Sequence, residues 1–484
     1  MSRGPSISCT AVLAVLGTLM GACSPDKVAQ VPADMTKAAA ETGPVLSFPG
    51  AFGWSPATDV APRLRVPQGP GPVVNTGIVP GHAVKLQQTV QLALAQSPDI
   101  GRAVAEIYRS RGDVMSAEAA WLPKATYVST IGTDPGSPAS VIAAYGRQRV
   151  SAGVELNQLV YDFGRADGQI AASHAVREQR DAELHDAEER VAMTASEAHL
   201  ELVRAQNMLG ATDHYLTALV NLRTAITLRA KSGAADQADV LVADSRVQSA
   251  RGERIRSQTR FASAQSKLYQ LTGVRLTRAA DPGTALQALT RAIKSAPGGT
   301  SAGVVAAEFA AAAARGRLKA AEAAVYPAIG IKASETFPIA DKSITATALL
   351  GFSVQGDLFS GGANEGRIKA ATADALSAER SIALARLNSQ TEIEGASAEV
   401  SGAAQRAVAY GRQLATVRQA REIALSEYSI GKRTLTEVLN MEQEIFRAES
   451  DRINADSDGQ VAIIRAAATS GVLVQSLLRL QGRS

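Results

Sequence analysis

The stretch that decides the fold is EYSIGKRTLTEVLN, residues 427–440, in the second half of the chain. A helix-type pattern of apolar residues runs into it from Ser360 and leaves it towards Gly471. Gly431 supplies the left-handed backbone that ends a helix, and Thr434 is a favourable N-cap for the next helix. The stretch therefore predicts a sharp turn between two long helices, which together form a hairpin.

Glycine spacing indicates that the chain contains this hairpin twice. Two sets of three glycines share the same intervals of 69 and 40 residues: Gly164, Gly233 and Gly273 in the first half, and Gly362, Gly431 and Gly471 in the second. A repeat at a fixed offset is typical of duplicated structural units. We therefore predict two tandem repeats, with Gly233 and Gly431 as the turns of their helical hairpins.

The N-terminus has the pattern of a secretory signal, predicted over residues 1–22. A positive residue, an apolar core and the small pair Gly21-Ala22 follow one another there. Cys23 comes next, and the sequence LMGAC that it completes resembles the bacterial lipobox. Cys23 would then be the lipid-bearing first residue of the mature protein, and the alternative is ordinary cleavage beside an incidental cysteine. Residues 23–81 contain ten prolines and little periodicity, so we expect a lipid-anchored, proline-rich tether.

The first repeat is predicted to span residues 82–280. After two short helices, apolar residues alternate with polar or small ones, which is typical of strands. We expect a β-hairpin over about 124–161, with strands long enough to cross an outer membrane. Long helices are predicted over 165–231 and 237–271, and the first of them would extend roughly 100 Å at 1.5 Å per residue.

The second repeat, residues 281–474, follows the same plan. Its predicted β-hairpin covers about 328–359, its long helices cover 363–429 and 435–469, and residues 475–484 are assigned to a C-terminal tail. Four strands cannot close a barrel, and lipid does not tolerate an open sheet edge. Other copies of the chain must complete the sheet, which predicts an obligate oligomer. The expected fold class is mainly α with a membrane β-barrel, built from two tandem repeats of long helical hairpins plus β-hairpins.

Composition and motifs indicate neither catalysis nor nucleic-acid binding. The formal net charge is only +4 over 484 residues. Four histidines, His174, His185, His199 and His214, lack the i,i+4 spacing of a metal pair on one helical face. No nucleophile elbow, phosphate loop or Cys-x-x-Cys is present in the sequence. We therefore expect no catalytic residue, no cofactor and no metal site, and the chain is not predicted to be an enzyme.

Together these features resemble the TolC family of outer-membrane channel-tunnel proteins, over about residues 84–474. The motifs that carry the resemblance are the helix ends Leu122-Pro123 and Tyr326-Pro327, the sequence LVYDFGR at 159–165, and Tyr428-x-x-Gly431-x-x-Thr434-x-x-Glu437-Val438-Leu439. The resemblance implies a homotrimer in the cell outer membrane, with a 12-stranded barrel in the lipid and a helical tunnel in the periplasm. It also implies two partners: a periplasmic adaptor (membrane fusion) protein and an inner-membrane transporter, ABC-type or proton-driven.

In that family, bonds between the helix pairs and a ring of acids close the periplasmic mouth. The resemblance therefore assigns periplasmic-entrance gating to Tyr428, Arg433 and Glu437, with Asp239 as the partner in the first repeat. We expect a charge-assisted bond between Arg433 and Asp239, because they occupy equivalent turns. Asn440 stands where the pattern has a second acid, so the acidic ring should be weaker here. The alternative is that these residues only cap two helical turns.

The favoured function is a passive exit duct for type I protein secretion, because the turn resembles the TolC branch of the family. No GGGW-like sequence occurs at the C-terminus, which separates the chain from the lipoprotein drug-efflux branch. The expected lipid on Cys23 favours instead the lipoprotein outer-membrane component of a multidrug efflux pump. A third alternative is a periplasmic helical-hairpin adaptor or scaffold lipoprotein. The alternating segments at 149–161 and 344–356 would have no use in such a protein.

Overall fold

The computed structural model describes residues 83–134, 147–233, 235–295, 301–338 and 347–481. Every described residue belongs to one compact unit, which falls within residues 65–484. The predicted signal sequence, Cys23 and the predicted tether therefore lie outside the described residues.

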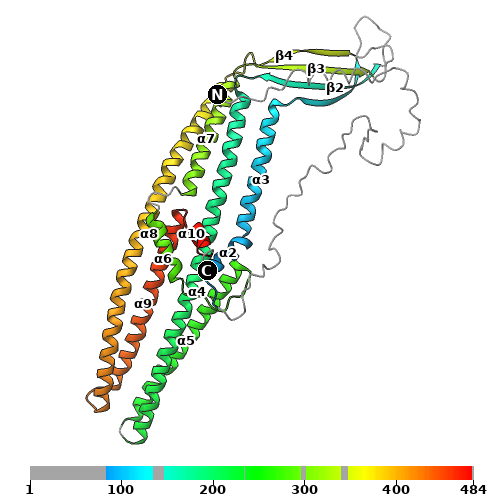
Figure 1. The fold of residues 1–484 in the computed structure, drawn as a ribbon. Helices are drawn as coiled ribbons and strands as arrows, with labels where there is room; N and C mark the ends of the chain where they lie inside the picture. The colour runs from blue at the N-terminus through cyan, green and yellow to red at the C-terminus, as the bar shows by residue number, and fades with distance from the viewer. Residues whose placement is uncertain (1–82, 135–146, 234, 296–300, 339–346, 482–484) are drawn as a thin grey trace, which may run out of the picture. The chain divides into compact units, whose positions relative to one another are not determined.

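Each repeat contains the same series of elements: two helices, two antiparallel strands and two longer helices (Figure 1). In the first repeat these are α2 (Leu86–Gln96), α3 (Pro98–Glu118), β1 (Lys124–Asp134), β2 (Arg147–Tyr161), α4 (Arg165–Lys231) and α5 (Gln237–Thr272), with the short 3-10 helix η4 (Ala119–Trp121) after α3. In the second they are α6 (Gly283–Ser295), α7 (Ala302–Ala323), β3 (Ala328–Pro338), β4 (Thr347–Gln355), α8 (Ala363–Ser429) and α9 (Leu435–Thr469). A further helix, α10 (Leu473–Gln481), follows. The predicted fold class is confirmed.

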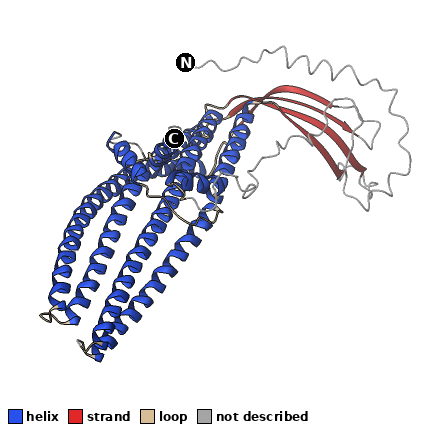
Figure 2. Ribbon diagram, turned by 60° about the horizontal axis from the view of Figure 1, so that its bottom comes forward, coloured by secondary structure: helices blue, strands red, loops and turns tan. Residues whose placement is uncertain are grey.

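Helices α4 and α8 each contain 67 residues and begin after a glycine in the left-handed conformation. Gly164 has φ +92° and Gly362 has φ +87°, values that L side chains rarely adopt. α4 packs against α3, α5, α7 and α9, whereas α8 packs against α7 and α9. Figure 1 and Figure 2 show the strands at one end of these helices and the two helical turns at the other. Each long helix therefore connects the sheet to a turn.

The two repeats differ where the long helices begin. Phe163 has φ +56°, a left-handed conformation that is strained for a bulky side chain. The equivalent residue 198 positions later is Gly361, with φ +61°. The Phe163 ring stacks on Tyr326, with 4.9 Å between ring centres, and meets the Tyr161 ring edge-on at 4.8 Å. Aromatic packing therefore holds a strained residue in the first repeat, where the second repeat uses glycine.

The buried carboxylate of Asp162 caps α4 by accepting the backbone N–H groups of Gly164 (3.2 Å) and Ala166 (2.7 Å). Asp162→Ala should lower the midpoint of thermal unfolding, measured by circular dichroism, because loss of a helix N-cap costs about 1–2 kcal/mol. Ser360→Ala is the matched control in the second repeat. The Ser360 hydroxyl accepts the N–H of Asn364 at 3.5 Å, which is a weaker bond. Equal losses in the two variants would contradict this prediction.

The four strands form one antiparallel sheet in the order β1-β2-β3-β4. On one face the register places apolar residues opposite one another, in the pairs Ile329–Val354, Ile331–Phe352 and Ala333–Leu350. On the other face Lys332 of β3 forms an ion pair with Glu155 of β2 at 3.0 Å. The sheet thus has an apolar face and a polar face, as expected for strands that meet lipid on one side.

Both outer strands have an edge that no described residue covers: β1 pairs only with β2, and β4 only with β3. Large apolar side chains on these strands are exposed, among them Tyr127 (61%) and Phe352 (82%). A sheet with open edges and exposed apolar side chains is incomplete in a single chain. This agrees with the predicted need for further copies.

Residues near the C-terminus are part of the core. The segment assigned to a tail, 475–484, is not a separate tail: most of it lies in α10, which packs against α2, α4, α6 and α9. Leu473 and Leu477 are buried in one cluster with Leu86 of α2 and Leu289 of α6. This cluster lies midway along the long helices (Figure 1) and joins elements of both repeats.

Helices α4 and α7 approach each other closely near the sheet. A Cβ atom added to Gly168 would lie 2.7 Å from the backbone nitrogen of Ala320 and 2.8 Å from the carbonyl oxygen of Gly316. A Cβ atom added to Gly316 would lie 2.8 Å from the backbone nitrogen of Ala172. Both helices therefore carry Gly-x-x-x-Ala at the crossing, a spacing of small residues that lets two backbones touch.

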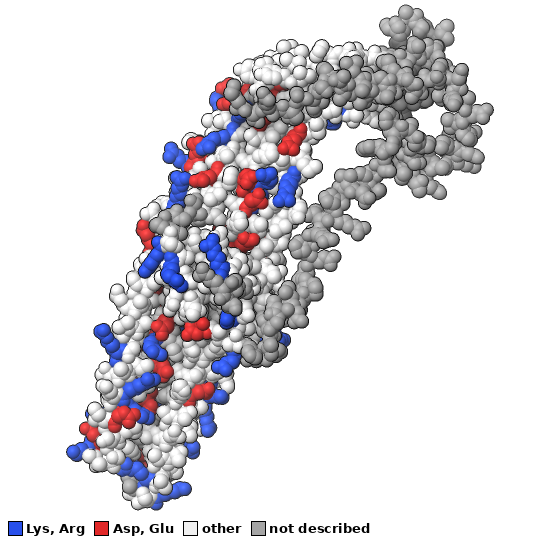
Figure 3. All heavy atoms as spheres, viewed as in Figure 1, with Lys and Arg blue, Asp and Glu red and all other residues white. Residues whose placement is uncertain are grey.

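The helices carry charged side chains along their length. On the face seen in Figure 3, acidic and basic side chains are interspersed over the helices. None of the described helices is by itself long and apolar enough to cross a membrane. Helices α9 and α10 reach such a length and composition only as a pair, and this pair is bent by 108° at the break between them.

Candidate functional site at the hairpin tips

The two helical turns are built in different ways. In the first, Gly233 has φ +76°, and Asp236 caps α5 by accepting a backbone N–H at 3.3 Å. In the second, Gly431 also has φ +76°. There the N–H of Glu437 donates to the Thr434 hydroxyl (3.4 Å), and the N–H of Thr434 donates to the Glu437 carboxylate (3.2 Å). Both predicted turn glycines adopt the left-handed conformation that ends a helix.

A hydrophobic cluster joins the two hairpins just behind their turns. Its buried members come from all four helices: Leu219, Leu222 and Ile226 of α4, Ala243, Val247 and Ala250 of α5, Ala424 of α8, and Leu435, Val438 and Leu439 of α9. Tyr428 packs against this cluster from the end of α8. Burial of apolar surface therefore holds the tips together within one chain.

Arg229, in the last turn of α4, reaches across to the end of α8. Its guanidinium lies 5.0 Å from the centre of the Tyr428 ring, and it donates to the carbonyl oxygens of Tyr428 (3.5 Å) and Ser429 (3.4 Å). These carbonyls lie at the C-terminal end of a helix, where partial negative charge favours a cation. The ring adds a cation–π contact. Arg229 therefore forms a polar link between the two hairpins at their tips.

Tyr428 lies near charges of both signs. Burial raises the pKa of its hydroxyl, Arg229 opposes this effect, and Asp239 adds to it. Both charges therefore influence the Tyr428 hydroxyl, with opposite signs. Asp239 is in the first turn of α5, so the structure brings the predicted residues Tyr428 and Asp239 to the same end of neighbouring hairpins.

The expected bond between Arg433 and Asp239 is not formed within the described chain. Nε of Arg433 donates instead to the Glu427 carboxylate at 2.6 Å, and this carboxylate raises the pKa of Arg433. The reason is local: the sharp turn at Gly431 folds the residues after it against the end of α8, so the nearest acid is six residues back. Within one chain Arg433 therefore pairs locally, and its bond to Asp239 stays a prediction for contacts between copies of the chain.

Two more of the predicted gating residues, Glu437 and Asn440, form no hydrogen bond or ion pair with the other hairpin in the described part of the chain. Glu437 is part of the reciprocal cap of α9, so the alternative role of helix capping applies to it. Asn440 is exposed at the start of the same helix. Within one chain, Arg433, Glu437 and Asn440 therefore serve the turn or face solvent, whereas Tyr428 packs between the hairpins and Asp239 is half-buried in the first turn of α5.

Several links between the hairpins were missed in the sequence. Besides Arg229 they are Arg246–Gln443 (3.3 Å), the stacked rings of Tyr215 and Phe446 (4.7 Å), and Arg204–Asn454 (2.9 and 2.7 Å). The signal for Arg229 is a basic residue in the last turn of a predicted helix, where exposed carbonyls attract cations. That signal does not identify which helix end receives the side chain.

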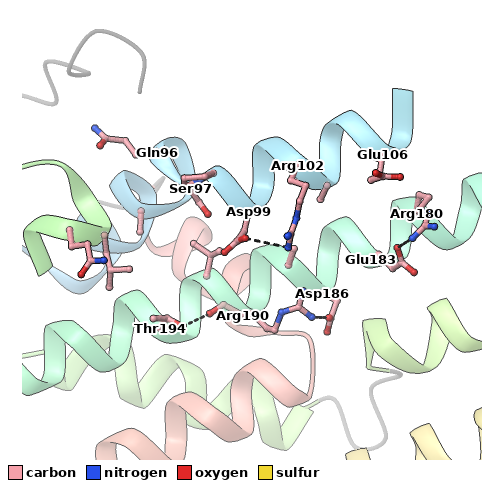
Figure 4. A pocket seen from close by; sticks show the side chains of 17 residues that line it. Gln96, Ser97, Asp99, Arg102, Glu106, Arg180, Glu183, Asp186, Arg190 and Thr194 are labelled. Carbon is pink, nitrogen blue, oxygen red and sulfur yellow. Dashed lines mark hydrogen bonds and ion pairs between the residues drawn. The ribbon is translucent and has the colours of Figure 1, made fainter. Parts of the chain in front are cut away.

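A cavity of about 1050 Å³ lies between α3 and α4, away from the tips (Figure 4). Its charged side chains pair within single helices: Arg102 with Asp99 at 3.4 Å, Arg180 with Glu183 at 2.6 Å, and Arg190 with Asp186. Among the described residues, no group of three histidine, cysteine or acidic side chains is arranged to hold a metal. The cavity therefore offers surface ion pairs and no constellation suited to catalysis.

His199 has a structural role. Its Nδ1 lies 2.9 Å from the Thr89 hydroxyl, and its Nε2 donates to the carbonyl oxygen of Ala280 at 3.0 Å. Burial lowers the pKa of the ring, so His199 is neutral near pH 7. It connects α4 to α2 and to the segment before α6.

Two tandem helical hairpins, joined to an antiparallel sheet that is open at both edges, define a subunit of an oligomeric outer-membrane channel. The chain belongs to the outer membrane efflux protein family, whose model matches residues 89–274 and 300–471, one segment in each repeat. The resemblance seen in the sequence is therefore confirmed.

Known proteins similar to this chain share its fold. Outer membrane efflux protein BepC of Brucella suis biovar 1 is 24% identical over 341 residues, which are 68% of this chain and 74% of BepC. The solved structure of VceC from Vibrio cholerae has a TM-score of 0.68 at 19% identity, covering 80% of this chain and 96% of VceC. The solved structure of CmeC from Campylobacter jejuni has a TM-score of 0.68 at 14% identity, covering 80% of this chain and 86% of CmeC.

The family defines the general activity. The chain is a passive outer-membrane channel and not an enzyme. Channels of this family are homotrimers with a helical tunnel in the periplasm, and they work with an adaptor and an inner-membrane transporter. The alternative of a periplasmic adaptor or scaffold lipoprotein is therefore excluded.

Proposed function

We propose that this channel is the outer-membrane exit duct of a tripartite pump that exports small molecules such as drugs. The family model matches both repeats, which supports an outer-membrane channel of a tripartite system in general. The name of the Brucella relative, an efflux protein, agrees with it. The preference for type I secretion depended on the turn that contains Arg433 and Glu437 and on the lack of a GGGW-like C-terminal sequence, and both of these side chains make local bonds at the turn. Efflux therefore becomes the first candidate.

Type I protein secretion is the second candidate. The sequence from Tyr428 to Leu439, which resembles the TolC branch, supports it. The two functions differ in the inner-membrane transporter: an ABC transporter for secretion, and a proton-driven or ABC pump for drugs. Membership of the family is compatible with either transporter.

We also propose that the hairpin tips form the periplasmic entrance. Tyr428 packs between the hairpins, where Arg229 links them, and Asp239 is in the first turn of α5. Arg433 lies on the second turn, Glu437 and Asn440 lie near the start of α9, and all three are exposed. In a trimer these exposed groups would face neighbouring copies, where Arg433 and a second copy's Asp239 could still form the expected bond. Opening then requires the hairpins to separate.

The two candidate functions can be separated in the bacterium that carries this chain. An in-frame deletion should lower the inhibitory concentrations of several dyes and antibiotics at least fourfold, and a plasmid copy should restore them. Loss of one large protein from the culture medium, with unchanged drug tolerance, would favour secretion instead. If neither drug tolerance nor the secreted proteins changed, the channel would have to carry a different cargo, and the proposed function would be wrong.

Lipid anchoring at Cys23 is proposed from the sequence, since this residue lies outside the described part of the chain. Cys23→Ser should remove the mass of a lipid group from the mature protein, measured by intact mass spectrometry of the detergent extract. Serine has no thiol to accept the lipid, so the change should be complete. Cys9→Ser, within the predicted signal sequence, is the control and should leave the mature mass unchanged. A mass change no larger than that of the sulfur-to-oxygen exchange itself would exclude the anchor.

A further inference from the structure

Glu189 is a buried carboxylate in the middle of α4. Its side chain is only 8% exposed. Oε1 accepts the backbone N–H of Val474, in the first turn of α10, at 3.3 Å. Oε2 is also buried but has no hydrogen-bond partner among the described residues. Glu189 therefore caps the last described helix with one oxygen, while the other oxygen is unsatisfied, an arrangement that is costly for an ionised group.

Helix α10 depends on this region for its position. It is only nine residues long, too short to be stable by itself in water. Leu473 and Leu477 attach it to the central cluster, which contains residues of α2, α4, α6 and α9. Since these helices come from both repeats, α10 joins the two repeats by packing against both. Any change in how firmly α10 docks affects the junction of the repeats.

The charged groups around Glu189 do not neutralise it. Those that share a cavity of about 380 Å³ with it are Asp186 and Arg190 of α4, which pair with each other, and Glu392 of α8, which accepts from Thr469 of α9 at 3.2 Å. Glu188 of α4, whose charge also acts on Glu189, pairs with His185 at 3.2 Å. The helices that pack against α10 also carry Arg465 of α9, which pairs with Glu197 at 2.8 Å, and Arg291 and Lys294 of α6, and α10 itself carries Arg479 in its last turn. None of these cations forms an ion pair with Glu189 in the described structure.

Two opposing effects act on this carboxyl. Burial raises its pKa, and the amide N–H groups at the start of α10 lower it. Burial is the larger effect, and repulsion from Glu188 adds to it, so that the pKa of Glu189 rises to about 7. The neutral carboxyl keeps a carbonyl oxygen that can accept from the amide of Val474, and it avoids a buried charge.

We propose that Glu189 is a proton-controlled latch for α10: the neutral carboxyl holds the helix in its site, and ionisation loosens it. Below about pH 4.5 the group is neutral whether α10 is docked or not, so docking has its full strength. Above about pH 7 docking must bury a charge, and the contribution is lost as pH rises between these values. A pKa raised from 4.5 to about 7 limits the change in the docking equilibrium to about 300-fold.

Hydrogen exchange of the full-length, detergent-extracted channel tests the latch. Exchange of α10 amides would be followed by mass spectrometry at pH 5.5, 7.0 and 8.5 and corrected for the intrinsic pH dependence of exchange. Protection of α10 should fall at least tenfold between pH 5.5 and 8.5, whereas protection of the α5 amides should not change. In Glu189→Gln, which has the same shape but no charge, α10 should stay protected at pH 8.5.

Glu183→Gln is the matched control on the same helix, because Glu183 is partly exposed and already paired with Arg180. Its α10 should lose protection at high pH as the wild type does. The proposal is overturned if protection of wild-type α10 is independent of pH, or if Glu189→Gln keeps the wild-type pH dependence. Should Glu189→Gln fail to assemble, the wild-type profile of α10 against α5 decides alone.

Discussion

Gly168→Ala and Gly316→Ala are each expected to destabilise the protein by about 1–3 kcal/mol, although alanine normally favours a helix over glycine. The new methyl group would lie 2.7 Å from a backbone atom of the opposite helix at Gly168, and 2.8 Å from one at Gly316. Backbone atoms cannot rotate away as side chains can, so α4 and α7 would have to separate. The measurement is the thermal midpoint of the detergent-extracted channel, together with the fraction that remains trimeric.

Gly210→Ala is the control for these two variants. Gly210 lies in the same helix, α4, and a Cβ atom there would meet nothing within 4 Å. Its replacement should leave stability unchanged or raise it by up to about 1 kcal/mol. If all three variants gave the same midpoint, the close crossing of α4 and α7 would not contribute to stability.

Arg229→Ser should raise the single-channel conductance in planar bilayers without affecting assembly. The substitution removes a cation–π contact and two long hydrogen bonds between the hairpin tips. Contacts of this kind, partly exposed, are worth about 1 kcal/mol in each subunit. If three subunits open together, about 3 kcal/mol is lost, which shifts the equilibrium from closed towards open channels by roughly 100-fold. The time-averaged conductance of a single channel rises for that reason.

Two substitutions distinguish this link from a general effect of charge or of the tyrosine hydroxyl. Lys231→Ser removes a positive charge at the same end of α4, where the side chain is exposed, and should leave the conductance unchanged. Tyr428→Phe keeps both the ring and the carbonyl oxygen that Arg229 uses, so it should also resemble wild type. Conductance of Arg229→Ser equal to wild type, in an intact trimer, would show that the hydrophobic cluster alone keeps the tips together.

Much of the fold could be predicted because glycines mark the ends of the long helices. Gly164, Gly233, Gly362 and Gly431 stand at positions where the backbone has positive φ, and no other residue adopts that conformation as easily. These positions determine where the long helices begin and end, so α4 and α8 cover the predicted residues 165–231 and 363–429. The strands could be predicted because apolar and polar residues alternate along them, and side chains of a strand point to its two faces in turn.

The remaining features depend on contacts between distant parts of the chain. Helix α10 has fewer than three turns, and only the partners of Leu473 and Leu477 on other helices make it part of the core. Arg229 meets Tyr428 across 199 residues of sequence, so no local pattern reports the contact. Arg433 had two acids within reach of a plausible turn, and the sequence could not show that Glu427 lies nearer than Asp239.

The glycine crossing of α4 and α7 has a mechanical consequence. From Gly168 to the end of α4 at Lys231, the helix extends roughly 95 Å at 1.5 Å per residue. An arm of that length converts a tilt of only about 3° at its base into a displacement of about 5 Å at its tip. A small change in the separation of the α4 and α7 backbones at the crossing would therefore move the tip of α4 by about the width of a side chain. Rigid packing at this point is therefore what permits weak bonds to control the tips.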